Sequence, residues 1–195
     1  MKKIILLPIL FLSFAQAETV VEKLSCKIET VVDGNTIICQ QDSTKETITL
    51  ILFQSIAPNG KQPYAKKAKD TLRKLLNIEN NFLIQSYGKD QFGNILVTIF
   101  EYKLYGCGSK NLATTCTKYN NINLEMIKQG ASWNNPLGQQ FSDYQQAQEE
   151  AKKAKRGLWT EPNPIPPWIY RQMIRHEEKK QTDFILEEYR HNHPY

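Results

Sequence analysis

Four cysteines carry the most definite chemistry in this sequence, and they fall into two local pairs. Cys26 and Cys39 flank residues 27–38, while Cys107 and Cys116 flank a short polar insert. Cysteines at such spacings form either zinc sites or disulfide bonds. The sequence has no Cys-x-x-Cys pair and no histidine near any cysteine, unlike the usual zinc-site spacings. An even number of locally paired cysteines therefore favours two disulfides in an oxidising compartment.

A group of positive side chains is the second feature with chemical potential. Apolar residues recur at helical spacing across residues 64–76, and the positions between them carry Lys66, Lys67, Lys69, Arg73 and Lys74. This basic face is either a solvated helix surface or a weak nucleic-acid patch, with Lys66, Lys67 and Arg73 as its binding candidates. The formal net charge of +5 falls to +3 without Lys2 and Lys3 of the N-terminal segment, and so mild a charge permits a polyanionic partner without indicating one.

The first seventeen residues have the pattern of an export signal. Lys2 and Lys3 precede an apolar run over residues 4–14, which is too short to span a bilayer as a helix. Ala15-Gln16-Ala17 then supplies a small-x-small cleavage site. We therefore expect a signal peptide over residues 1–17, a periplasmic or secreted chain, and no transmembrane segment after cleavage. An uncleaved anchor is the alternative.

The remaining sequence alternates short strand patterns with helices. Asp33-Gly34 between β-branched runs predicts a hairpin within residues 25–39. Further strands are expected over residues 47–53, 82–87 and 95–102, and helices over residues 64–76, 122–130, 142–155 and 168–189. This order predicts an α+β fold built on a small closed barrel of the oligonucleotide-binding (OB) type. The proline-rich connector after residue 161 divides a domain at 18–161 from a C-terminal helical extension at 162–195.

Several motifs, in order along the chain, resemble the staphylococcal nuclease (thermonuclease-like) family. They are Val-Asp-Gly-Asn-Thr at 32–36, Ala-Pro at 57–58 with Lys-Gln-Pro-Tyr at 61–64, Asp-Gln-Phe-Gly-Asn at 90–94, the segment from Asn123 to Trp133, and Lys-Arg-Gly-Leu-Trp at 155–159. The resemblance covers roughly residues 20–170. It implies a five-stranded OB-fold barrel with three helices, to which the C-terminal helix is an addition.

The resemblance also implies a chemistry, the calcium-dependent hydrolysis of phosphodiester bonds. In the family two aspartates hold the metal ion, two arginines clamp the phosphate and a glutamate manages the attacking water. Calcium prefers anionic oxygen ligands, and guanidinium groups match the oxygens of a phosphorane bidentately.

Carried onto this sequence, the family's pattern is lost at most positions. The hairpin's metal aspartate becomes Asn35 although Asp33 remains, and the other departures are Ile51 and Asn94 for the arginines, Ile56 for the second metal aspartate and Asn59 for the glutamate. No shift in alignment restores the set, because no arginine precedes Arg73 and no acidic residue occurs from Thr47 to Lys69. We therefore predict no catalytic residues, no metal site and no cofactor.

Three functions are compatible with these departures. We favour a non-catalytic pseudonuclease that acts as a binding or structural component of an envelope assembly, with a protein partner. The alternatives are a secreted Ca²⁺-dependent nuclease that uses other residues, and an OB-fold module that binds nucleic acid without cleaving it. In the last case Tyr64, Tyr87 and Phe92 are candidates for base stacking. Beyond the proline-rich connector, a C-terminal helix that begins with Trp168 carries apolar side chains that must dock on its own domain or on another protein, and Trp168 is its binding candidate.

Overall fold

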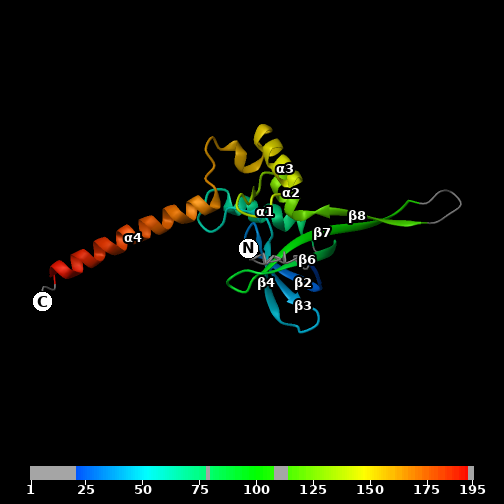
Figure 1. Cartoon of the computed structure of the whole chain (residues 1–195), viewed down its shortest axis with the longest axis horizontal. Coiled ribbons are helices and arrows are strands. Elements are labelled where there is room, and N and C mark those ends of the chain that lie inside the picture. Colours follow the sequence, from blue (N-terminus) through cyan, green and yellow to red (C-terminus); the bar gives the residue numbers. More distant parts are fainter. Residues whose placement is uncertain (1–20, 78–79, 108–113, 193–195) are drawn as a thin grey trace, which may run out of the picture.

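A computed structural model describes residues 21–77, 80–107 and 114–192, and the expected signal peptide at 1–17 lies outside these ranges. The predicted α+β class is confirmed (Figure 1). The strands are β1 (Glu22–Leu24), β2 (Cys26–Val31), β3 (Thr36–Gln41), β4 (Thr47–Leu52), β5 (Ser55–Ile56), β6 (Asn81–Lys89), β7 (Ile95–Gly106), β8 (Thr115–Asn121) and β9 (Trp133–Asn134). The helices are α1 (Ala65–Leu75), α2 (Ile122–Lys128), α3 (Ser142–Lys153), the 3₁₀ helix η1 (Gly157–Thr160) and α4 (Pro167–Asn192).

The main sheet is mixed and open, so the prediction of a closed five-stranded barrel was wrong. Seven strands form it, in the order β1-β6-β7-β4-β3-β2 with β8 added to β7, and β4 and β7 run parallel. The two ends of this path, β1 and β2, are consecutive in the chain and are separated only by Ser25. The break at Ser25 lets the two segments pair with different neighbours, β6 and β3, instead of with each other.

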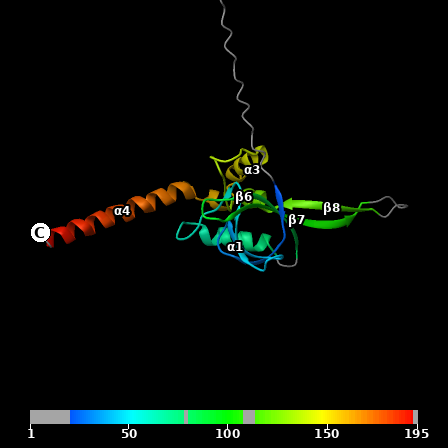
Figure 2. The ribbon, with the colours of Figure 1, turned by 60° about the horizontal axis from the view of Figure 1, so that its bottom comes forward.

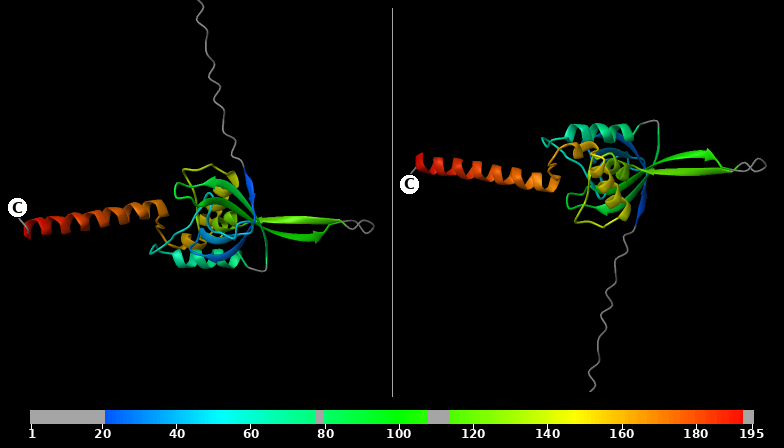
Figure 3. Two further views of the ribbon diagram at one scale, coloured as in Figure 1. Left: turned by 90° about the horizontal axis from the view of Figure 1, so that it is seen from below. Right: turned by 90° about the horizontal axis from the view of Figure 1, so that it is seen from above.

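Strand β8 was not foreseen, because its sequence lacks an apolar alternation that marks a half-buried strand. It forms by pairing with the outer part of β7, which continues four residues beyond the predicted end at Tyr102. The resulting hairpin projects from one side of the domain, and α4 projects from the opposite side (Figures 1 and 2). Views from below and above show both projections extending away from the rest of the domain (Figure 3).

The core lies between the sheet and helices α1 and α2, and a buried polar side chain organises it. Asn123 at the start of α2 is 0% exposed. Its amide donates to the carbonyls of Phe53 (3.0 Å) and Val97 (2.9 Å), and its Oδ1 accepts from the N–H of Ile99 (3.2 Å). All three partners are backbone groups, and of these the carbonyl of Val97 also accepts the N–H of Phe53 at 2.7 Å. One side chain thus joins α2 to β7 and to the segment that leaves β4.

The predicted hairpin turn at Asp33-Gly34 packs directly against α1. A Cβ atom added to Gly34 would lie 2.5 Å from the Cβ of Ala57 and 2.8 Å from the Cβ of Ala68. These distances are too short for any side chain, so glycine is required here for the close approach. The contact brings together the turn, α1 and the loop after β5.

Both predicted disulfides are present, Cys26–Cys39 and Cys107–Cys116. The first joins β2 to β3 diagonally, since Cys39 pairs in register with Ile28. The second closes the base of the insert whose residues 108–113 lie outside the described ranges. None of the described helices combines the length and apolar character that crossing a membrane would require.

We expect Asn123→Ala to lower the free energy of unfolding by about 2–4 kcal/mol, because it removes three hydrogen bonds and leaves the carbonyl of Phe53 and the N–H of Ile99 without this partner. Urea denaturation of both proteins measures this difference. Asn120→Ala is the matched control, since the amide of Asn120 makes a single 3.4 Å hydrogen bond to Glu101 on the projecting hairpin. Equal losses for the two variants would contradict the central role of Asn123.

Candidate functional site

Four of the positions singled out by the family resemblance line one open pocket of about 770 Å³. Asn35 follows the hairpin turn, Ile51 lies on β4, Ile56 ends β5 and Asn59 lies in the loop after it. Thr36, which also lines the pocket, pairs in register with Ile51. The structure therefore gathers these four side chains at one site, on the surface formed by β3, β4 and the loop after β5.

The residues of this pocket do not fit a calcium ion. Calcium is held by six to eight oxygen ligands, several of them carboxylates. Ile51 and Ile56 contribute hydrocarbon, and Oδ1 of Asp33 accepts the backbone N–H of Asn35 at 2.9 Å within the turn. Within the described ranges no three His, Cys, Asp or Glu side chains are grouped so that they could hold a metal ion.

Asp90 is the acidic residue of the pocket lining, and its carboxylate is occupied by its own turn. Oδ2 accepts the side-chain N–H of Asn94 at 2.9 Å, and Oδ1 accepts the backbone N–H groups of Phe92 and Asn94, each at 2.9 Å. These bonds, the one from the Asn94 side chain first, hold the pKa of Asp90 below its ordinary value. The amide of Asn94 is therefore part of a turn and does not point a donor into the pocket.

Helix α4 completes the pocket with Arg171, Ile174 and Arg175. This contribution of α4 was not predicted from the sequence, because the family resemblance ends near the start of the helix and local pattern does not indicate which surface an added helix contacts. The spacing of Arg171 and Arg175 is the sequence feature that points to this face of the helix, because residues four apart lie on the same side. Both side chains are exposed, and within the described part of the chain neither makes an ion pair or hydrogen bond.

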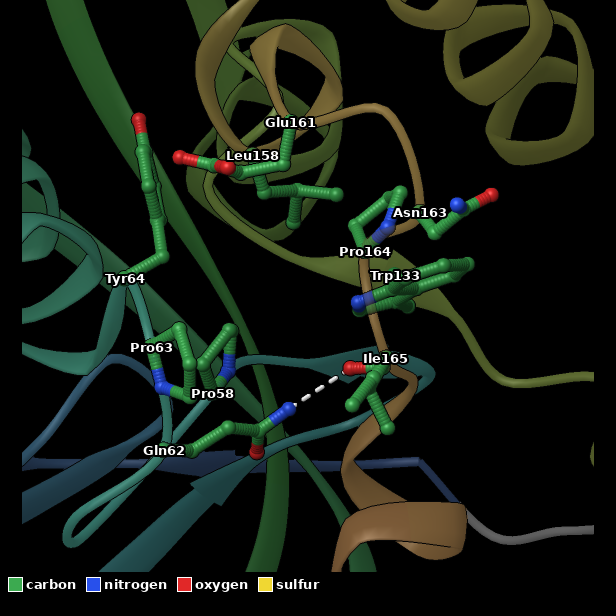
Figure 4. Close-up of a pocket in the computed structure, with 10 residues that line it drawn as sticks. All are labelled: Pro58, Gln62, Pro63, Tyr64, Trp133, Leu158, Glu161, Asn163, Pro164 and Ile165. Carbon is green, nitrogen blue, oxygen red and sulfur yellow. Dashed lines mark hydrogen bonds between the residues drawn. The ribbon is translucent and has the colours of Figure 1, made fainter.

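The proline-rich connector fixes where α4 begins. The buried side chain of Gln62 donates from Nε2 to the carbonyl of Ile165 at 2.7 Å (Figure 4). Pro167 is fully buried, and the ring of Trp168 packs edge-on against Trp133 with centroids 5.8 Å apart. These contacts attach the first turn of α4 to the domain and so aim the helix across the pocket.

A smaller cavity of about 130 Å³ lies beside this attachment, between Pro58, Tyr64, Trp133, Leu158 and the connector (Figure 4). Gln62 Oε1 and Trp133 Nε1 are buried and have no hydrogen-bond partner among the described residues. The cavity has room for water molecules that would satisfy both atoms. We assign it a structural role in seating the connector.

Comparison with known proteins identifies the scaffold. The family model described as Staphylococcal nuclease homologue matches residues 42–161. The chain belongs to the staphylococcal nuclease family. It is 30% identical over 171 residues to a Haemophilus influenzae protein named "Uncharacterized endonuclease", covering 88% of this chain and 86% of that protein. It is 26% identical over 147 residues to the "Micrococcal nuclease" of Shigella flexneri, covering 73% of this chain and 77% of that protein.

The nuclease-family match covers only part of the pocket. Ile51, Ile56 and Asn59 fall inside residues 42–161, whereas Asn35 precedes that range. Helix α4, with both of its pocket arginines, follows it. The pocket is thus built from the family's own strand and loop positions together with a helix beyond the matched part of the chain.

The other binding candidates are spread over the surface. Lys66 and Lys67 lie at the start of α1, where Lys67 sits over the Tyr64 ring at 5.4 Å, and Arg73 near its far end faces Asp70 at 3.7 Å. Trp168 packs against Trp133 within the domain. These four predicted binding residues do not form one site, and whether any of them binds a partner stays a prediction.

The predicted stacking aromatics have different surroundings. Tyr87 stacks on Phe53 with ring centroids 4.5 Å apart, so one of its faces is covered. Tyr64 is half-buried beside the connector. Phe92 is 79% exposed at the pocket, and its ring is the one available to a ligand there.

We expect Asn94→Ala to raise the pKa of Asp90 toward its ordinary value, since the variant removes the largest cause of the depression. A depressed folded-state pKa stabilises the fold above the unfolded-state pKa, and this contribution is lost as pH falls through the folded-state pKa. The difference in the free energy of unfolding between wild type and variant should therefore be present at neutral pH and should disappear in acid. NMR titration of the Asp90 carboxyl carbon measures the shift, with Asn35→Ala as the control. An unchanged pKa in Asn94→Ala would contradict the assignment.

Proposed function

We propose that this chain is a non-catalytic member of the staphylococcal nuclease family that acts by binding. The observation that carries the proposal is the lining of the pocket. Asn35, Ile51, Ile56 and Asn59 lie together at the place where the family mechanism needs two carboxylates for a metal ion, a guanidinium and a general base. The side chains that remain are neutral amides and hydrocarbon, which neither hold calcium nor activate water.

The rate loss expected from replacing the two arginines supports a complete loss of cleavage by that mechanism. Removing a single arginine that stabilises a phosphoryl-transfer transition state costs about 10³- to 10⁵-fold in rate. Here both arginine positions are changed, to Ile51 and Asn94, and the amide of Asn94 is hydrogen-bonded within its turn. Asp33 and Asp90 remain nearby, but both carboxylates already accept backbone N–H groups.

The proposed setting is the periplasm or the exterior of a bacterial cell, and the two disulfides are compatible with it. We propose further that a protein partner in the envelope contacts the outer part of α4. That part of the helix projects from the domain, and Met173 and Phe184 expose 49% and 66% of their surfaces. Large apolar side chains on a projecting helix are typical of a surface that a partner covers.

A secreted nuclease that uses other residues is the second candidate function. The observation in its favour is that the relatives found by comparison bear the names endonuclease and micrococcal nuclease. Asp33 and Asp90 are the carboxylates from which such a site would have to start. A cleavage assay separates the two candidates directly.

We expect the purified exported protein to leave single-stranded DNA and RNA intact in millimolar Ca²⁺, because its pocket lacks the groups for metal binding and water activation. A variant that restores the family set, Asn35→Asp, Ile51→Arg, Ile56→Asp, Asn59→Glu and Asn94→Arg, should cleave at least about 10³-fold faster than wild type. Fragments are followed on denaturing gels.

Reactions with a chelator serve as blanks, and circular dichroism verifies that the restored variant is folded. Cleavage by the wild type that requires Ca²⁺ would overturn the non-catalytic proposal. In that event Asp33→Ala and Asp90→Ala would show which carboxylate the unexpected site uses.

Two truncations separate the attached part of α4 from its projecting part. A chain ending at Asn163 loses the Trp168–Trp133 contact and the buried Pro167, so its melting temperature should fall by several degrees. A chain ending at His176 keeps both contacts and should melt like the full chain. Both truncations should lose the envelope partner in pull-downs analysed by mass spectrometry. If the chain ending at His176 still recovered the partner, the binding surface would not be the outer part of α4.

A further inference from the structure

The outer part of the β7–β8 hairpin forms an arm that projects from the domain (Figures 2 and 3). The arm consists of residues 102–106 of β7 and 115–119 of β8, and the Cys107–Cys116 disulfide joins the strands at its far end. We propose that this arm binds the surface of a membrane that contains anionic phospholipids, as a peripheral contact that does not span the bilayer. None of the residues that line the family pocket belongs to the arm, so the inference holds whether or not that pocket cleaves nucleic acid.

Exposed apolar side chains lie on both faces of the arm. Successive side chains of a strand point to opposite faces, and directly paired residues share a face. Leu104 therefore lies on the same face as Tyr102 and its partner Tyr119, whereas Tyr105 lies on the other face. Leu104, Tyr105 and Tyr119 expose 65%, 52% and 54% of their surfaces. A protein partner covers one face of a ribbon, but a lipid interface surrounds it, so this distribution favours lipid.

The residue types of the arm suit the interface between lipid and water. Tyrosine combines an apolar ring with a hydroxyl group that hydrogen-bonds, and it is enriched where the headgroups of a bilayer meet its hydrocarbon. The ring of Tyr119 lies 6.1 Å from that of Tyr102 and 6.4 Å from that of Phe100, measured between centroids. These contacts hold Tyr119 in place near the base of the arm, while Leu104 supplies a purely apolar contact further out.

The charge of the arm is complementary to an anionic surface. Residues 102–119 contain Lys103, Lys110 and Lys118 and no aspartate or glutamate. Lys103 and Lys118 pair directly across the two strands, and like charges in that position destabilise a ribbon. Glu101 at the base faces Lys103 at 3.2 Å, whereas Lys118 makes no ion pair with any described residue. Anionic headgroups would remove the repulsion between the two lysines and attract the arm.

The backbone of the arm is already ordered for such a contact. Pairing continues without a break from Phe100 with Asn121 to Gly106 with Thr115, and the N–H of Cys107 donates to the carbonyl of Thr114 at 3.0 Å. Paired backbone groups enter an apolar environment at a much lower cost than unpaired ones. A free two-stranded hairpin is only marginally stable in water, and the disulfide holds the far end of this one together. Little ordering is then required on binding.

Nucleic acid is the other polyanion that the lysines would attract. A phosphate backbone offers no apolar surface to Leu104, and the base edges of a duplex are polar. A membrane surface provides phosphate for Lys103 and Lys118 together with hydrocarbon for Leu104 and Tyr105. Lipid therefore satisfies both kinds of side chain on the arm, and binding of nucleic acid by the arm becomes an outcome of the test.

The test is flotation of the full exported protein with vesicles made of equal parts phosphatidylglycerol and phosphatidylcholine, with bound protein measured against lipid concentration. Leu104→Ser with Tyr105→Ser should weaken binding at least about ten-fold, because binding strength follows the apolar surface that is buried. Leu137→Ser with Phe184→Ser is the matched control. It removes side chains that are 90% and 66% exposed elsewhere on the chain, and should change binding less than about two-fold.

The lysines are examined separately on the same vesicles. Lys103→Gln with Lys118→Gln should weaken binding at least about ten-fold, since each lysine near an anionic surface strengthens binding about five-fold. Lys66→Gln with Lys67→Gln removes the same charge from α1 and should change binding less than about two-fold. Vesicles of phosphatidylcholine alone should bind the wild type at least about ten-fold more weakly than the mixed vesicles. Circular dichroism and melting temperatures verify that each variant is folded.

The proposal is overturned if the wild type does not float with the mixed vesicles, or if the arm variants and their matched controls lose binding equally. Equal binding to both kinds of vesicle would contradict the role of the lysines. A fluorescein-labelled single-stranded DNA oligonucleotide of mixed sequence, titrated without lipid, examines the other polyanion. If the oligonucleotide binds and Lys103→Gln with Lys118→Gln abolishes its binding while the vesicles remain unbound, the arm contacts nucleic acid and not a membrane.

Discussion

The amide of Asn123 is the interaction on which the pocket depends. It joins the carbonyl of Phe53, where the chain leaves β4, to two backbone groups of β7. The segment that follows Phe53 carries Ile56 and Asn59, so the position of two of the four family positions in the pocket is set from the core. A buried amide with partners for both its donor and its acceptor stabilises such a junction, whereas the same groups left unpaired would each cost about 1–3 kcal/mol.

The groups that build the scaffold and the groups that line the pocket are physically separate. Gly34 meets Ala57 and Ala68 on the inner side of the hairpin turn, while Asn35 faces the pocket one residue later. Substitutions at Asn35, Ile51 or Asn59 change charge and hydrogen bonding at an open surface without disturbing those close contacts. This separation explains how a chain keeps the nuclease fold while its pocket carries different chemistry.

Helix α4 changes what the pocket is able to do. Arg171 and Arg175, on a helix that follows the matched family region, line the pocket together with Ile51 and Ile56. Such a placement supplies attraction for a phosphate but no carboxylate pair for a metal ion. In the proposed non-catalytic function, this placement would favour binding over hydrolysis. The β7–β8 hairpin with its disulfide projects from the side of the domain opposite to α4 (Figure 3).

The sequence by itself determined the α+β class, the helices, the turn at Asp33-Gly34, both disulfides and the family, because these depend on local pattern and ordered motifs. It also placed Asn35, Ile51, Ile56 and Asn59 at one site, through resemblance to a known fold. Only the tertiary structure decided the open path of the sheet, the pairing of β8, and the approach of Arg171 and Arg175 to the pocket. Each of those depends on contacts between segments distant in the chain, such as Gln62 with Ile165, and local periodicity carries no information about which distant segments meet.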